Sequence, residues 1–212
     1  TIQGGALGAA GCAAIVAAYR VALDRRAPII GVWHSGGARL AEGVASLDGV
    51  GRIFAAMTQA SGLVPQVSVV LGPAAGGAAY GPALTDVVVL GPAGRVFVTG
   101  PDVVRSVTGE DVDMATLGGP EPHGRRSGVV HVVTESDAEA YAAARRIVGL
   151  LGDPLGRVLP AADRPMAELL PASARRAYDV RPLVDRLLDG PGTELHAKWA
   201  PNIVTTLGRL GG

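Results

Sequence analysis

The sequence has a single cysteine, few aromatic residues and no net charge. Cys12 alone can form neither an internal disulfide nor a multi-cysteine zinc site, and its alanine-rich helical surroundings predict a buried, unreactive thiol. The 19 basic residues equal the 19 acidic ones, so we expect neither nucleic acid nor a membrane surface as a partner. Apolar runs stay below the roughly 18 residues of a spanning helix. With no cleavable signal visible, we expect a cytoplasmic protein.

Small residues dominate what the sequence does contain. Glycine accounts for 31 of the 212 residues, whereas aromatic residues make up 4% and hydrophobic residues 48%. That hydrophobic fraction suffices to bury the core of one large domain. Because bulky rings are scarce, we expect a core of alanine and aliphatic side chains packed closely against glycine, which is typical of a dense α/β domain.

Strands and helices alternate along the first 151 residues. Short continuous apolar runs such as Ile29-Ile30-Gly31-Val32-Trp33 are typical of buried parallel strands, and segments with helical spacing separate them. We therefore predict an α/β fold with a parallel sheet and crossover helices. The expected strands cover 29–33, 65–71, 86–90, 95–98 and 129–133, the expected helices cover 8–26, 42–60, 78–84, 102–107 and 136–151, and 108–128 is expected to be a loop.

The composition changes after residue 151, where prolines become frequent. We predict a domain over 1–151, an interdomain linker with a short helix at 180–188 over 152–201, and the first strand of a second domain over 202–212. The chain starts in a glycine turn without methionine, and its last predicted strand has no partner after it. We therefore expect a fragment of a longer protein that lacks the second domain.

Two of the predicted strands run into a Gly-Gly turn that opens a helix. Glycine lets the backbone approach a ligand closely, and the first N–H groups of a helix lack acceptors and attract negative charge. Two such turns at the carboxyl ends of neighbouring strands would form one oxyanion site, suited to an enolate. For either turn alone, close packing of helix on strand explains the glycine pair equally well. The turns consist of Ser35, Gly36, Gly37, Ala38 and Arg39, and of Ala75, Gly76, Gly77 and Ala78.

Other chemical motifs are missing from the sequence. It contains no Gly-x-Ser-x-Gly elbow, no phosphate loop ending in Gly-Lys-Ser/Thr and no His-Glu-x-x-His, and we predict no metal site. His34 and Ser35 are neighbours in a strand and point to opposite faces, which argues against a nucleophile and base pair. We interpret His123, His131 and His196 as structural or surface residues.

The motifs that contain these turns resemble, in order, those of the carboxyltransferase (β) subunits of biotin-dependent acyl-CoA carboxylases, of the propionyl-CoA and acetyl-CoA type found in actinobacteria. The resemblance runs along nearly the whole chain. It rests on Gly4-Gly5-Ala6-Leu7-Gly8, Ser35-Gly36-Gly37-Ala38-Arg39 with Glu42-Gly43-Val44, Ser61-Gly62 to Pro65-Gln66, Ala75-Gly76-Gly77-Ala78-Ala79-Tyr80, Thr99-Gly100-Pro101-Asp102, Thr108-Gly109-Glu110-Asp111, Leu117-Gly118-Gly119 and Ser127-Gly128-Val129.

The resemblance implies a crotonase-like domain that binds the acyl-CoA, with Gly76 and Gly77 as the oxyanion donors. It implies further that Ser35 to Arg39 line the CoA side and that Ala75, Ala78, Gly100 and Pro101 contribute to substrate binding. The carboxyl group would come from carboxybiotin on a separate carrier, through a biotin carboxylase and carrier (α) subunit, and the intact protein would form a homo-hexamer. Without a biotin pocket, this chain alone is not expected to carboxylate an acyl-CoA.

Two other interpretations remain open at this point. One is a crotonase-like decarboxylase or hydratase that uses the same enolate site. The other is a non-catalytic module that binds acyl-CoA or holds an assembly together. Ala74 and Gly81 stand where relatives often have other small residues, but they do not indicate an acyl chain length.

Overall fold

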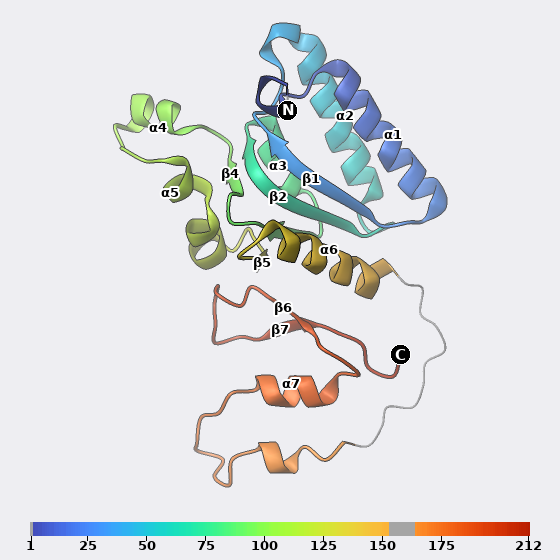
Figure 1. Ribbon diagram of the computed structural model, residues 1–212, viewed down its shortest axis with the longest axis vertical. Coiled ribbons are helices and arrows are strands. Elements are labelled where there is room, and N and C mark those ends of the chain that lie inside the picture. The colour runs from blue at the N-terminus through green and yellow to red at the C-terminus, as the bar shows by residue number, and fades with distance from the viewer. Residues whose placement is uncertain (1, 153–163) are drawn as a thin grey trace.

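A parallel sheet lies at the centre of the computed structural model, which describes residues 2–152 and 164–212 (Figure 1). The strand order is β1-β2-β3-β5, and β4 pairs with the end of β2 beyond β3. All these pairs are parallel, which confirms the predicted α/β fold. The strands are β1 (Ile29–Ser35), β2 (Gln66–Ala75), β3 (Val87–Leu90), β4 (Arg95–Phe97) and β5 (Val132–Val133).

The helices of the α/β part begin and end within two residues of the predicted positions. Figure 1 shows α1 and α2 side by side, with α4 and α5 (Met114–Gly118) at the other end of the sheet. The helices are α1 (Ala9–Arg25), α2 (Val44–Ala60), α3 (Gly77–Ala83), α4 (Pro101–Thr108) and α6 (Asp137–Gly152), and two short 3-10 helices, η1 (Gln3–Gly5) and η2 (Leu40–Glu42), precede α1 and α2.

Helices cover both faces of β2, which explains its continuous apolar sequence. Val67 and Val69 pack in one cluster with the alanines of α6, whereas Val70 lies in another cluster with Ala79 of α3. Because successive side chains of a strand point to opposite faces, both sets must be apolar. The sheet thereby holds the carboxyl ends of β1 and β2 rigidly beside each other.

Small residues let α1 and α2 approach closely. A Cβ atom at Gly49 would lie 2.8 Å from the Cβ atom of Cys12. Cys12 is 1% exposed, and burial raises the pKa of its thiol, with a smaller effect from the charge of Glu42. The prediction of a buried cysteine is therefore confirmed, and the raised pKa disfavours the reactive thiolate form.

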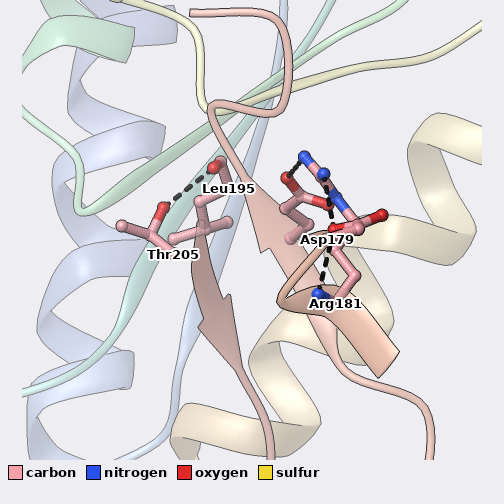
Figure 2. A network of polar contacts seen from close by, with 5 residues as sticks. Asp179, Arg181, Leu195 and Thr205 are labelled. Atoms are coloured by element: carbon pink, nitrogen blue, oxygen red, sulfur yellow. Dashed lines mark hydrogen bonds and ion pairs between the residues drawn. The ribbon is translucent and has the colours of Figure 1, made fainter. Parts of the chain in front are cut away.

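The C-terminal part forms a separate antiparallel pair of strands below α6 in Figure 1. It contains η4 (Ala167–Leu169), α7 (Arg181–Leu187), β6 (Thr193–Leu195) and β7 (Thr205–Leu207). Figure 2 shows two of its polar links: the Arg181 guanidinium pairs with Asp179 at 3.3 Å, and the Thr205 hydroxyl donates to the Leu195 carbonyl at 2.8 Å. Leu195 and Leu207 pack against the α6 cluster, so the pair of strands extends the core.

Three stretches differ from the prediction. The segment 108–128, predicted as a loop, contains α5 (Met114–Gly118) and a π-helix, η3 (Pro122–Ser127), and the strand predicted at 129–133 is shortened to β5. Asp113 caps α5 by accepting a hydrogen bond from the Thr116 N–H, a role that sequence alone does not distinguish from ligand binding. The strand predicted within 202–212 is β7, which pairs with β6 in the segment assigned to the linker. Residues 153–163 of that linker lie outside the described residues.

Candidate active site

The two predicted glycine turns meet at one edge of the sheet. Because β1 and β2 are parallel neighbours, both turns follow the same end of the sheet, and a register shift between Trp33 and Ser35 adds a bulge just before the first turn. A Cβ atom at Gly37 would lie 2.8 Å from the Ala75 carbonyl oxygen and 3.5 Å from the Gly77 nitrogen. Gly37 also has a φ of +100°. Both the close approach and the backbone conformation therefore require glycine at this position.

Internal hydrogen bonds use two amides of the first turn. The Gly36 N–H donates to the Gly4 carbonyl at 3.0 Å, and the Gly37 N–H donates to the Ser35 hydroxyl oxygen at 3.1 Å. Ser35 is 4% exposed and thus supports the turn from inside. Ser35, Gly36 and Gly37 therefore support the turn itself, and the amides of Gly36 and Gly37 are not offered to a ligand.

Leu7 forms a parallel bridge with Ala38, and this bridge holds the second half of the turn. The Leu7 N–H donates to the Gly37 carbonyl at 2.8 Å, and the Arg39 N–H donates to the Leu7 carbonyl at 2.9 Å. Because successive N–H groups of an extended chain point in opposite directions, the Ala38 N–H points away from Leu7. Among the amides of this turn, Ala38 is thus the one that the bridge leaves available.

The Arg39 side chain is directed to the N-terminal segment. Its guanidinium pairs with Glu42 at 2.8 Å and donates to the Ala6 carbonyl at 3.1 Å. The other Glu42 oxygen accepts from the Ala9 N–H at 2.7 Å, at the start of α1. This N–H first, and Arg39 second, hold the pKa of Glu42 below its ordinary value. Arg39 therefore connects the turn to η1 and α1, and its positive charge is paired with Glu42 and not directed at a ligand.

The second turn is held by backbone contacts. Gly76 has a φ of +55°, and its N–H donates to the Phe97 carbonyl at 3.2 Å. A Cβ atom at Gly76 would have no neighbour within 4 Å, so the space beside it is free of protein atoms among the described residues. Gly77 and Ala78 are the first two residues of α3, and their N–H groups have no acceptor inside the helix.

The remaining predicted substrate residues lie further along the chain. Gly100 caps α4 and Pro101 is its first residue, three positions or more beyond the Phe97 that holds Gly76. The Gly100 carbonyl accepts from the N–H groups of Val103 and Val104. Within the described residues, no hydrogen bond joins Gly100 or Pro101 to either glycine turn.

Two positions considered for the acyl group are core residues. Ala74 is 0% exposed in β2, and a Cβ atom at Gly81 would lie 2.1 Å from the Trp33 ring. The Trp33 indole N–H donates to the Ser68 hydroxyl at 2.9 Å, which holds the ring beneath α3. These small residues therefore allow α3 to pack on the sheet.

Three histidines make contacts within the fold that the sequence does not indicate. The His123 ring bridges the Ser127 hydroxyl, at 2.8 Å, and the Val96 carbonyl of β4, at 2.7 Å. The rings of His131 and His196 contact each other in a tilted arrangement, with centroids 4.5 Å apart, at the junction with the C-terminal strands. The only sequence signal for the contact between His123 and Ser127 is their spacing of four residues, which occurs too often by chance to identify it.

Neither a metal cluster nor a membrane span is found in the described part of the chain. Residues 2–152 and 164–212 contain no group of three or more His, Cys, Asp or Glu side chains that could hold a metal ion. No helix of these residues is long and apolar enough to cross a membrane.

A parallel sheet with two adjoining glycine turns, one of them opening a short helix, places this chain in the crotonase-like class of folds. The whole chain, residues 1–212, matches the carboxyl transferase domain family, and it belongs to that family. The crystal structure of transcarboxylase 12S with methylmalonyl-coenzyme A and methylmalonic acid bound superimposes with a TM-score of 0.89 at 35% identity. That match covers 98% of this chain and 42% of the other.

The curated relatives include subunits of enzymes that are named for different reactions of coenzyme A thioesters. The beta6 subunit of the biotin-dependent acetyl-/propionyl-coenzyme A carboxylase of Mycobacterium tuberculosis is 59% identical over 217 residues, covering 100% of this chain and 46% of that protein. The alpha subunit of methylmalonyl-CoA decarboxylase of Veillonella parvula is 40% identical over 223 residues, covering 100% and 44%. The chain spans less than half the length of each relative.

Proposed function

We propose that this chain is the acyl-CoA half of a carboxyltransferase, which prepares a short acyl-CoA for carboxylation at its α carbon. The observation that carries the proposal is the contact between the two glycine turns, where Gly37 lies against Ala75 and Gly77. The family membership and the identity to an acetyl-/propionyl-CoA carboxylase subunit support this reaction class.

In this proposal the thioester carbonyl oxygen accepts hydrogen bonds from the N–H groups of Gly77 and Ala38. The enolate of the acyl-CoA carries negative charge on that oxygen, and amides about 2.7–3.1 Å away would stabilise it; the role proposed for this chain is that stabilisation and not the transfer of the α proton. Gly76 is not a donor in this proposal, because its own N–H is bonded to the Phe97 carbonyl. Its contribution is a backbone with positive φ and the free space beside it. The proposal therefore keeps Gly77 of the predicted pair of donors, Gly76 and Gly77, and replaces Gly76 by Ala38.

Carboxybiotin on a separate carrier would supply the carboxyl group that the α carbon receives. Within the described residues, we propose that the glycine turns bind the thioester. We propose no contact between this chain and biotin. We further propose an α subunit with biotin carboxylase and carrier parts as partner. A homo-hexamer is proposed by analogy with transcarboxylase 12S, which is described as a hexamer assembly. The cytoplasmic location and the second domain after residue 201 stay predictions.

Replacing Gly76 by valine tests the proposal in the assembled enzyme. A branched side chain would occupy the free space beside Gly76 and strain its φ of +55°. We expect carboxylation of propionyl-CoA to fall by a factor of about 10² or more, as when an oxyanion donor is lost. Gly51→Ala on α2 is the matched control, because a Cβ atom there also meets nothing within 4 Å and the backbone is helical. Turnover by Gly76→Val close to that of Gly51→Ala would contradict the assignment.

A decarboxylase is the second candidate, because the chain is also 40% identical to the alpha subunit of a methylmalonyl-CoA decarboxylase. The same amides would stabilise the enolate left when a carboxyl group departs. Incubation with malonyl-CoA and with an enoyl-CoA separates the candidates. Release of the carboxyl group without a carrier favours the decarboxylase, hydration favours a hydratase, and binding of a CoA thioester without reaction favours a binding module.

A further inference from the structure

The short strand β4 connects the glycine turns to His123, a residue that has no role in the function proposed above. β4 contains three residues and pairs with β2 along Pro73 to Ala75. Its Phe97 carbonyl accepts the Gly76 N–H at 3.2 Å on the side of β2. Because successive carbonyls of a strand point in opposite directions, the Val96 carbonyl faces the outer edge of β4.

His123 occupies that outer edge. One ring nitrogen, Nε2, lies 2.7 Å from the Val96 carbonyl oxygen, and a carbonyl can only accept, so Nε2 carries the proton. The other, Nδ1, lies 2.8 Å from the Ser127 hydroxyl oxygen and, in the neutral ring, accepts a hydrogen bond from that hydroxyl. The Ser127 oxygen accepts in turn from the Val129 N–H at 3.3 Å. These contacts specify a single tautomer of His123, the one that can hold Val96.

The end of α5 packs closely against the same outer edge of β4. A Cβ atom at Gly118 would lie 2.1 Å from the Val96 carbonyl oxygen, so the end of α5 lies directly against the same carbonyl. The π-helix η3 presents His123 and Ser127 on one side, four residues apart. A hydrogen bond from His123 on one edge of β4 and a hydrogen bond from Gly76 on the other thus hold a three-residue strand between them.

We propose that His123 is a positioning residue for the thioester site, acting through β4. It holds Val96, the adjacent Phe97 carbonyl holds the Gly76 N–H, and the bond to Phe97 orients Gly76 so that the Gly77 N–H is directed at the thioester oxygen. Ser127 supports this role by fixing the tautomer of the ring. The inference rests on the proposed function, because it takes the Gly77 amide as a donor to the carbonyl.

The test compares two ligands that differ in the carbonyl group. Propionyl-CoA carries the thioester carbonyl, whereas S-propyl-CoA is the thioether that lacks it, and calorimetry measures the affinity of the protein for each. A hydrogen-bonded carbonyl should make propionyl-CoA bind about tenfold more tightly in the wild type. In His123→Leu this ratio should fall towards one while the affinity for S-propyl-CoA stays unchanged. His123→Gln, whose side-chain amide can still donate to Val96, should retain most of the ratio.

Control variants separate positioning from stability. His196→Leu removes a comparable bond, from the His196 ring to the Gly128 carbonyl at 2.9 Å, and should leave the ratio unchanged. Ser127→Ala keeps the imidazole and should lower the ratio partly, so it tests the inference even where His123→Leu does not fold. A wild-type ratio near one would overturn the proposed function and the inference with it. A tenfold wild-type ratio that persists in His123→Leu or Ser127→Ala, or equal weakening of both ligands, would overturn the inference alone.

Discussion

The two glycine turns have similar sequences but are held in different ways. The turn from Ser35 to Arg39 relies on side chains and on the N-terminal segment: the Ser35 hydroxyl, the pair of Arg39 with Glu42, and the bridge to Leu7. The turn around Gly76 relies on backbone hydrogen bonds to β4 and on close packing against Gly37. Most amides of the first turn therefore donate to acceptors within the protein. In the second turn, the first N–H groups of α3 have no acceptor inside the helix.

This difference shows that a glycine pair in the sequence does not by itself identify the donors. Both turns predict exposed N–H groups, yet Gly36, Gly37 and Gly76 all donate within the protein. What remains available is one amide of the first turn and the start of α3. The site is thus formed by the contact between the turns. The predictions below break that contact, remove one of its supports, or change a distant region that should leave it intact.

The largest effect is expected from Gly37→Val, which breaks the contact itself. Its Cβ atom would lie 2.8 Å from the Ala75 carbonyl oxygen, and its φ of +100° strains any branched side chain. The two turns must separate, and a displacement of about 1 Å at a reacting group can cost about 10²-fold in rate. We expect at least that loss in carboxylation of propionyl-CoA by the assembled enzyme.

A milder change at the same turn serves as the control for Gly37→Val. Gly36→Ala introduces a Cβ atom whose nearest neighbour is the Gly4 carbonyl oxygen at 3.8 Å, an ordinary contact distance, and it needs no left-handed backbone. It should keep most of the activity. Equal activity of Gly37→Val and Gly36→Ala would show that the contact between the turns does not matter for the reaction.

Much of the fold follows from local patterns in the sequence. The apolar spacing of α1, α2 and α6 and the valine runs of β2 and β3 indicate each element within a few residues, because both faces of these two strands and one side of each helix are buried. One face of β1, with Ile30 and Val32, is exposed, although its apolar run predicts a buried strand. The strand β6 contains three residues, too few for an alternating pattern to be recognised within the predicted linker. The strand β7 lies within the predicted segment 202–212, but the sequence does not predict its pairing with β6.

The site could be predicted as a pair of turns, but its internal bonds could not. Whether the Gly76 N–H is free depends on Phe97, and the direction of Arg39 depends on Glu42 and Ala6. These partners are brought together by the sheet and by the N-terminal segment, and no local spacing encodes them. The same holds for His123, whose partner Val96 lies in a different strand.

A smaller effect is expected from Ser35→Ala, which removes a support of the first turn. The buried Gly37 N–H would lose its acceptor, which costs about 1–3 kcal/mol of the free energy of unfolding. Urea unfolding of the purified protein measures this loss. Thr58→Ala on α2 is the matched control, because its hydroxyl is exposed and donates to carbonyls that helical N–H groups already use. Equal midpoints for both variants would show that Ser35 does not support the turn.

The smallest effect on either turn is expected from the titration of His131, which lies at the junction with the C-terminal strands. Its Nδ1 accepts from the Val88 N–H at 3.0 Å, and burial first and the neighbouring His196 second lower its pKa from 6.5 to about 4. Glu194 and Lys198 border the same cavity. The unfolded chain binds a proton below pH 6.5 and the folded chain only near pH 4, so this contribution to stability is complete above pH 6.5 and is lost as the pH falls towards 4.

Hydrogen exchange, corrected for its intrinsic pH dependence, should locate that loss. Between pH 6.5 and 4.5 the amides of β6 and β7 should lose protection, because the His131 ring links their segment to β3 through Val88 and lies against His196. The amides of Gly36 and Gly37 should keep theirs, since their acceptors are a carbonyl and a hydroxyl that do not titrate in this range. His131→Asn, which can still accept from Val88 but does not titrate, should abolish the change. Equal loss of protection at the glycine turns would mean that the junction and the site unfold as one unit.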